Sequence, residues 1–181
     1  MKTALLLVFW FQSLMGLESG LYFSSQEDIG LRFLEKIEEE KISVRIASER
    51  ISQKEIVEAL VAAHKRKVVV EVIVDSISVT KNTPLHFLVK EGVNVFVWQE
   101  KKAFRNKGGT KRMKHAFCVF GTDLSWIGSY KFSSTLQAGH AEEALCLKDE
   151  KIAKGFLEEF DLMKTRFCQP FSSYVNQKSK N

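Results

Sequence analysis

Residues 68–75 read V-V-V-E-V-I-V-D, a nearly continuous run of β-branched residues that decides the fold class. β-Branched residues favour strands, and an apolar run without strict alternation is typical of a strand covered on both faces. Helical spacing of apolar residues precedes this run at 53–66 and follows it at 83–91. A buried strand between two helices predicts an α/β fold.

The same reading extends to both ends of the chain. The remaining predicted elements are strands at 21–24, 42–47, 93–98, 117–120, 124–129 and 142–147, and helices at 26–40 and 150–165. Strands first alternate with helices and then follow one another closely. This order predicts a mixed, mostly parallel sheet with helices on both faces.

The composition is that of one soluble domain. The chain has 181 residues, of which 45% are hydrophobic and 27% charged, and its net charge is +5. It contains no glycine-rich phosphate loop, no G-x-S-x-G elbow and no H-E-x-x-H motif. These absences exclude the nucleotide-binding, serine-hydrolase and zinc-protease classes that carry those motifs.

Residues 1–19 differ from the rest of the sequence. A short positive start is followed by an apolar run of about signal length and by small residues suited to cleavage. We expect a signal peptide at 1–19, a folded domain at 20–168 and a flexible tail at 169–181. The protein would then be exported, either periplasmic or secreted. The alternatives are a membrane anchor formed by residues 3–17, or a buried helix.

A basic segment joins two of the predicted strands. Between Glu100 and Lys114 there are seven basic residues and one acidic residue. Such a segment attracts phosphate groups, and the alternative is an ordinary solvated loop.

Three cysteines are spread over the second half of the chain. Cys118 and Cys146 lie in apolar strand-like runs, which favours small buried hydrophobic residues. The alternative is a disulfide between them, which requires neighbouring strands. No pair of cysteines has the spacing of zinc ligands.

Residues 112–129 read R-M-K-H-A-F-C-V-F-G-T-D-L-S-W-I-G-S. With V-E-V-I-V-D, L-V-K-E-G-V-N-V and W-I-G-S-Y-K-F-S-S in this order, the sequence resembles the phospholipase D superfamily over residues 21–167. It is most similar to the short single-motif members, of the exported bacterial endonuclease and mitochondrial cardiolipin hydrolase types.

The resemblance implies a phosphodiesterase mechanism without a metal or other cofactor. The family motif is His-x-Lys, four residues, Asp, and then Gly-Ser-x-Asn. The histidine attacks phosphorus to form a phosphohistidine, and the lysine and asparagine hold the phosphate oxygens. A second histidine protonates the leaving group. A single-motif chain must pair with a second copy to supply it, so the resemblance implies a homodimer.

This sequence departs from that motif in either of two registers. In the first register Gly128, Ser129 and Glu142 match the family, whereas four functional positions are replaced. The replacements are Lys114 for histidine, Ala116 for lysine, Gly121 for aspartate and Lys131 for asparagine.

The second register places His115 at the histidine position, with Phe117 for lysine and Thr122 for aspartate. Side chains alternate faces along a strand, so His115 and Lys114 point to opposite faces. A bulge near Met113 would bring His115 back to the family's pocket.

We therefore expect an exported, phospholipase D-like domain that recognises phosphodiesters of phospholipid or nucleic acid through a basic groove, with catalysis reduced or lost. It would act as a homodimer, with a peripheral membrane contact. The candidate phosphate-binding residues are Lys114, Lys131, Ser129, Lys111 and Arg112.

Two alternatives remain. The first is an active phosphodiesterase, a phospholipase D or a nuclease. Its candidate catalytic residues are the nucleophile His115, with Ser129, His140 as acid or base, and Glu142 orienting a histidine. The second alternative is an exported protein-binding module.

Overall fold

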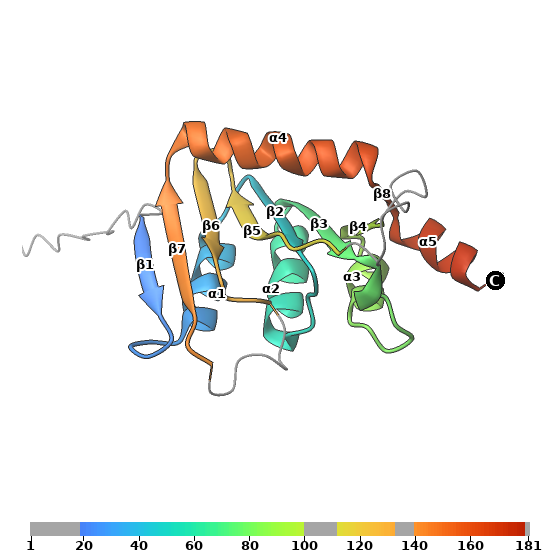
Figure 1. Ribbon diagram of the computed structural model, residues 1–181, viewed down its shortest axis with the longest axis horizontal. Coiled ribbons are helices and arrows are strands. Elements are labelled where there is room, and N and C mark those ends of the chain that lie inside the picture. Colours follow the sequence, from blue (N-terminus) through green and yellow to red (C-terminus); the bar gives the residue numbers. More distant parts are fainter. Residues whose placement is uncertain (1–18, 100–111, 133–139, 180–181) are drawn as a thin grey trace, which may run out of the picture.

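The computed structural model describes residues 19–99, 112–132 and 140–179 (Figure 1). In chain order the elements are β1 (Gly20–Phe23), α1 (Ile29–Glu39), β2 (Ser43–Ser48), α2 (Lys54–Lys65), β3 (Val69–Asp75), the 3₁₀ helix η1 (Ser76–Ser78), α3 (Leu85–Lys90), β4 (Asn94–Trp98), β5 (Ala116–Phe120), β6 (Leu124–Gly128), β7 (Glu143–Lys148), α4 (Glu150–Arg166), β8 (Cys168–Pro170) and α5 (Phe171–Lys178). Each strand and helix predicted between residues 21 and 165 is present close to its predicted position.

The described strands form one eight-stranded sheet in the order β1-β7-β6-β5-β2-β3-β4-β8. The predicted α/β fold with a mixed sheet is confirmed, but the expectation of a mostly parallel sheet is wrong. Among these strands only β2–β3 and β3–β4 run parallel. Helical crossovers join those three strands, whereas β5, β6 and β7 pair antiparallel with their neighbours.

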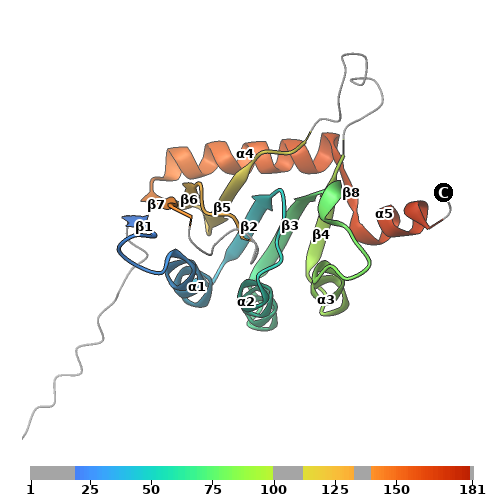
Figure 2. The ribbon, with the colours of Figure 1, turned by 60° about the horizontal axis from the view of Figure 1, so that its bottom comes forward.

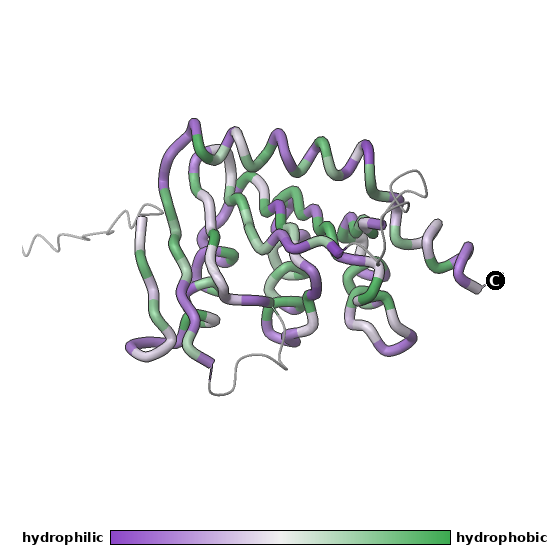
Figure 3. Tube along the Cα trace, in the orientation of Figure 1, coloured by the Kyte–Doolittle hydropathy of each residue, from purple (hydrophilic) through white to green (hydrophobic). Residues whose placement is uncertain are grey.

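Helices cover both faces of the sheet, as predicted. Figure 2 shows α1, α2 and α3 on one side of the strands and α4 on the other. Figure 3 shows hydrophobic residues concentrated in the strands, whereas α4 alternates between hydrophobic and hydrophilic positions. The sheet is therefore the shared centre of two hydrophobic cores.

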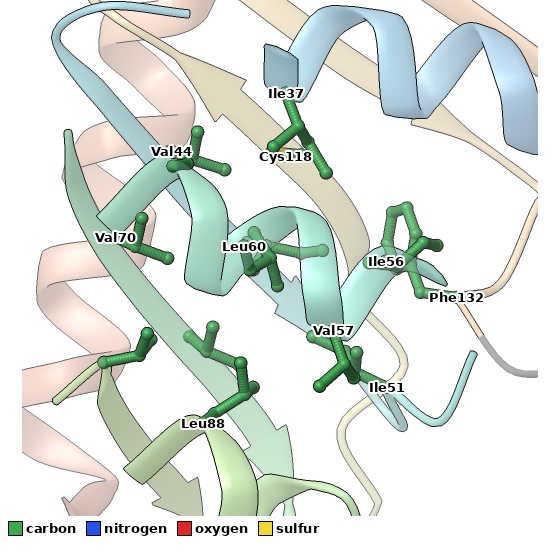
Figure 4. Packing of buried hydrophobic residues seen from close by; sticks show 14 of the residues in the cluster. Ile37, Val44, Ile51, Ile56, Val57, Leu60, Val70, Leu88, Cys118 and Phe132 are labelled. Atoms are coloured by element: carbon green, nitrogen blue, oxygen red, sulfur yellow. The ribbon is translucent and has the colours of Figure 1, made fainter. Parts of the chain in front are cut away.

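The larger core lies beneath α1, α2 and α3. Figure 4 shows Leu60 of α2 above Val44 of β2 and Val70 of β3, and all three side chains are buried. Local capping supports α1: the Asp28 carboxylate accepts a hydrogen bond from the backbone N–H of Leu31 at 3.1 Å.

Charged side chains join α4 to the other face of the sheet. The Glu71 carboxylate on β3 accepts hydrogen bonds from Arg45 Nε at 2.9 Å and from Lys164 Nζ of α4 at 3.0 Å. Burial lowers the pKa of Lys164, but its hydrogen bonds to Glu71 and Asp161 outweigh burial and raise that pKa overall. The Glu71 carboxylate therefore forms ion pairs with both Arg45 and Lys164 beneath α4.

The structure contradicts the disulfide alternative. Cys118 on β5 and Cys146 on β7 are separated by β6, where Trp126 pairs with both residues. All three cysteines are free, and burial raises the pKa of the Cys146 thiol to about 11 and of the Cys168 thiol to about 12.

The segment after residue 168 is not the flexible tail that was predicted. β8 pairs with β4, and α5 follows it to Lys178. Phe171 is 4% exposed and packs edge-on against the ring of His86, which fixes α5 on the domain. Tyr174 and Val175 follow Phe171 at helical spacing and pack against the same core, but three apolar residues are too short a pattern to have predicted the helix.

Across residues 19–99, 112–132 and 140–179, no helix combines the length and the apolar character needed to cross a membrane.

Candidate functional site

Six strands bring the candidate residues to one edge of the sheet. β2, β3 and β4 end there, because Ser48 pairs with Val74 and Asp75 with Trp98. β5 starts at the same edge, since Ala116 pairs with Ser48. The end of β6 and the start of β7 lie beside it. Lys111 and residues 100–110 of the basic segment lie outside the described residues.

Asp75, at the end of β3, fixes the segment that enters β5. Its carboxylate is 1% exposed, and Oδ2 accepts a hydrogen bond from the backbone N–H of Met113 at 2.7 Å. Oδ1 accepts from the backbone N–H of Ile77 at 2.9 Å and from the Ser76 hydroxyl at 3.2 Å. A buried carboxylate with three donors therefore anchors the backbone immediately before Lys114 and His115.

Lys114 and His115 lie toward opposite faces of the sheet. Phe117, two residues beyond His115, belongs to the core beneath α4, whereas Cys118 belongs to the core beneath α1–α3. Lys114 is 74% exposed at its side chain, and its Nζ lies 3.2 Å from Glu49 Oε2. The alternation predicted from the strand period is therefore present at the entrance to β5.

His115 is turned toward α4. Its Nε2 lies 3.5 Å from Glu159 Oε1 of α4, and its ring contacts Phe117 edge-on at 5.7 Å between centroids. The pairing of Ala116 with Ser48 and of Phe117 with Ala47 is regular, so no bulge interrupts the described part of β5. The structure thus supplies no local rearrangement that returns His115 to the other face.

The Gly128-Ser129 turn is built around Glu143. A Cβ at Gly128 would lie 2.3 Å from the Glu143 carbonyl oxygen, so only glycine permits this approach. The Ser129 hydroxyl donates to Glu143 Oε2 at 3.1 Å and accepts from the Glu143 N–H at 3.0 Å. Glu142 was predicted from its match to the family, whereas the partner of Ser129 is the adjacent Glu143, for which the sequence carried no separate signal.

Glu142 and His140 lie beside the N-terminal segment. The Ser24 hydroxyl donates to the His140 carbonyl at 3.0 Å and accepts from the Glu142 N–H at 2.9 Å. Burial raises the pKa of the Glu142 carboxyl above its ordinary value. The nearby His140 and Lys131 oppose this shift but do not cancel it. His140, Lys131 and Glu142 thus form one electrostatic group.

The candidate residues consequently fall into separate groups. Lys114 interacts with Glu49, and His115 interacts with Glu159 on the opposite face. Glu159 was missed because 44 positions separate it from His115 in the sequence (159 − 115 = 44). In the part of the chain that the structure describes, no group of three or more histidine, cysteine or acidic residues is arranged to hold a metal ion.

Comparisons with known proteins agree with this arrangement. Residues 33–164 match the family described as "Cardiolipin synthase, PLD-like domain". The fold and the residues at this edge define a domain of the phospholipase D-like class. The chain belongs to the phospholipase D superfamily, as the sequence resemblance predicted.

Solved structures share the fold at low sequence identity. Nuc from Salmonella typhimurium, a phospholipase D family member, is 18% identical with a TM-score of 0.73 over 85% of this chain and 97% of that chain. NucT from Helicobacter pylori is 20% identical with a TM-score of 0.75 over 85% and 99%. Phosphatidylserine synthase from Haemophilus influenzae is 10% identical with a TM-score of 0.63 over 87% and 41%. No curated protein sequence matches the chain.

Proposed function

We propose that this protein binds phosphodiesters at the family's site and does not hydrolyse them. The observation that supports this proposal best is the placement of Lys114 and His115. In the first register Lys114 stands at the family's histidine position, and the neighbouring His115 has its Nε2 3.5 Å from Glu159 Oε1 of α4. A protonated lysine has no lone pair with which to attack phosphorus, so it binds a phosphate without forming a covalent intermediate.

The edge of the sheet is suited to an anionic ligand. The ion pair between Lys114 and Glu49 is well exposed, and such pairs contribute little stability. A phosphate can therefore compete with Glu49 for the ammonium group. Lys131, which is exposed, adds a second positive charge where the family has a neutral asparagine.

The positions of the family's lysine and aspartate carry no functional side chain. Ala116 and Gly121 stand there, and neither can clamp or polarise a phosphate. Removing one such donor from an active site reduces the rate by about 10²–10³-fold. The combined losses support binding without turnover.

The proposal extends to assembly and location. Pairing of two copies through the Gly-Ser edge would join both cationic sites into one groove for phospholipid or nucleic acid, and the expected signal at residues 1–19 would export the protein. Peripheral membrane contact would follow for a phospholipid ligand.

The test combines turnover with binding. The full 181-residue chain and His115→Ala are incubated with bis-p-nitrophenyl phosphate, and binding to DNA and to anionic liposomes is measured between 50 and 200 mM salt. We expect no turnover by either protein, and binding that weakens with salt. Lys114→Gln and Lys131→Gln should each reduce the salt slope by about 1, whereas the control Lys148→Gln should not.

Two outcomes would refute the proposal. Turnover that His115→Ala abolishes would establish the alternative of an active phosphodiesterase. Absence of binding to both ligands would favour the protein-binding alternative. Sedimentation equilibrium of the same protein tests the proposed dimer separately.

A further inference from the structure

A cavity of about 470 Å³ lies on the α4 side of the sheet, with Lys114 at its rim. Its volume is in the range of small-molecule sites. It is lined by Trp98, Arg112, Met113, Lys114, His115, Glu159, Met163 and Phe167.

The cavity is apolar inside and charged at its rim. Met113 and Met163 are each 2% exposed, and Trp98 and Phe167 are partly buried at the ends of β4 and α4. Glu159 is 40% exposed at its side chain and is held by His115. An aromatic wall beside fixed polar groups is typical of sites for planar ligands.

Arg112 indicates that the ligand of this cavity carries a negative charge. Its side chain is exposed, and with the described residues it makes neither an ion pair nor a hydrogen bond. A guanidinium group binds phosphate through two parallel hydrogen bonds. At the rim of an aromatic cavity, an unengaged arginine therefore points to a ligand that combines a ring with a phosphate.

We propose that this cavity binds a nucleoside monophosphate unit, either free or at the end of a single strand. The base stacks against Trp98 and Phe167, Arg112 holds the phosphate, and Glu159 accepts hydrogen bonds from the base. This site adjoins the proposed phosphodiester site, shares Lys114 with it and lies on the α4 side of β5.

The polar rim favours a nucleotide over a phospholipid. Arg112, Lys114, His115 and Glu159 make up half of the lining residues. A nucleobase has donors and acceptors for a carboxylate, whereas lipid acyl chains would bring apolar surface against these charged groups and desolvate them without compensation.

The experiment measures binding of AMP to the full-length chain by calorimetry, together with tryptophan fluorescence. Adenosine, inorganic phosphate and dihexanoyl phosphatidic acid are the comparison ligands. We expect saturable AMP binding with quenching, and binding at least tenfold weaker for each comparison ligand. Arg112→Gln should weaken AMP binding about tenfold. The matched control is Lys154→Gln, which removes one positive charge from α4 outside the cavity and should change little.

Trp98→Phe locates the site without removing an aromatic side chain. It should retain AMP binding within a few fold but lose most of the quenching, because stacking tolerates the change of ring. A pentanucleotide with a 5′-phosphate distinguishes a strand end from a free nucleotide.

Three results would overturn the inference: no AMP binding at millimolar concentration, equal loss in Arg112→Gln and Lys154→Gln, or tighter binding of the phosphatidic acid. Lys131→Gln should leave AMP binding unchanged while weakening polymer binding. The nucleotide cavity and the phosphodiester site can therefore fail independently.

Discussion

Replacing Asp75 by asparagine should destabilise the protein and loosen the entrance to β5. The carboxylate is 1% exposed, and its two oxygens accept from two backbone N–H groups and one hydroxyl. Asparagine keeps the shape but replaces one oxygen by a donor. In either amide orientation, one buried backbone N–H then faces another donor and has no acceptor.

The magnitude follows from those contacts. An unsatisfied buried donor costs about 1–3 kcal/mol, and a hydrogen bond to a charged group contributes about 1.5–3 kcal/mol. The unsatisfied donor and the lost charge-assisted hydrogen bond are the same contact, so their costs are not added. The two ranges overlap at about 1.5–3 kcal/mol, which is the expected loss. That is a large share of a typical unfolding free energy of about 5–15 kcal/mol.

Urea denaturation at pH 7 measures the loss, and hydrogen exchange of the Met113 amide shows where it arises. The control is Asp123→Asn, because Asp123 is partly exposed and its oxygen lies 3.8 Å from Lys148 Nζ. It should lose less than about 1 kcal/mol. Equal losses in the two variants would refute the anchoring role. An unchanged Met113 exchange rate in Asp75→Asn would refute it too.

Four further predictions concern other contacts. Gly128→Ala should cost about 2–3 kcal/mol in urea denaturation, because the new Cβ meets backbone that cannot move aside. Glu71→Gln should cost about 2 kcal/mol in the same assay, since its two cationic partners lose their counter-charge. All three cysteines should resist a thiol reagent at pH 8 in native protein and react in denaturant, because burial limits access to each thiol and raises its pKa further above that pH. Glu142→Gln should raise the melting temperature at pH 7 but not at pH 4. The folded pKa of Glu142 is raised, so its ionised form weakens folding at neutral pH and the penalty disappears once it is protonated.

The strands and helices were predictable because their signals are local. The run at 68–75 became β3, and the period-2 alternation placed Phe117 and Cys118 in different cores. The relative directions of the strands were harder to predict from the sequence. A turn at Gly121, which has a φ of +57°, joins β5 and β6 as a hairpin. Counting that hairpin and the following strands as antiparallel would have corrected the expected sheet.

The contacts that shape the candidate site are long-range and left no local signal. Asp75 and Met113 are 38 positions apart, and the acid follows β3 as many strand-end residues do. The nucleotide cavity depends on α4 meeting the end of β4, which is a property of the folded domain. Most candidate residues at this edge of the sheet could be predicted from the sequence, whereas their interaction partners are visible only in the tertiary structure.

The placement of the substituted positions is compatible with a fold that tolerates the loss of catalysis that we propose. The two cores lie on either side of the sheet, and they contain Phe117, Val119, Cys118 and Phe120 of β5. In the first register the functional positions lie at strand ends: Lys114 and Ala116 at the start of β5, Gly121 at its end and Lys131 beyond β6. Of these, Lys114 and Lys131 are exposed, so their side chains contribute little burial. A lysine at position 114 leaves both cores and the Asp75 anchor intact, so the stability of the fold does not oppose the loss of catalysis that we propose.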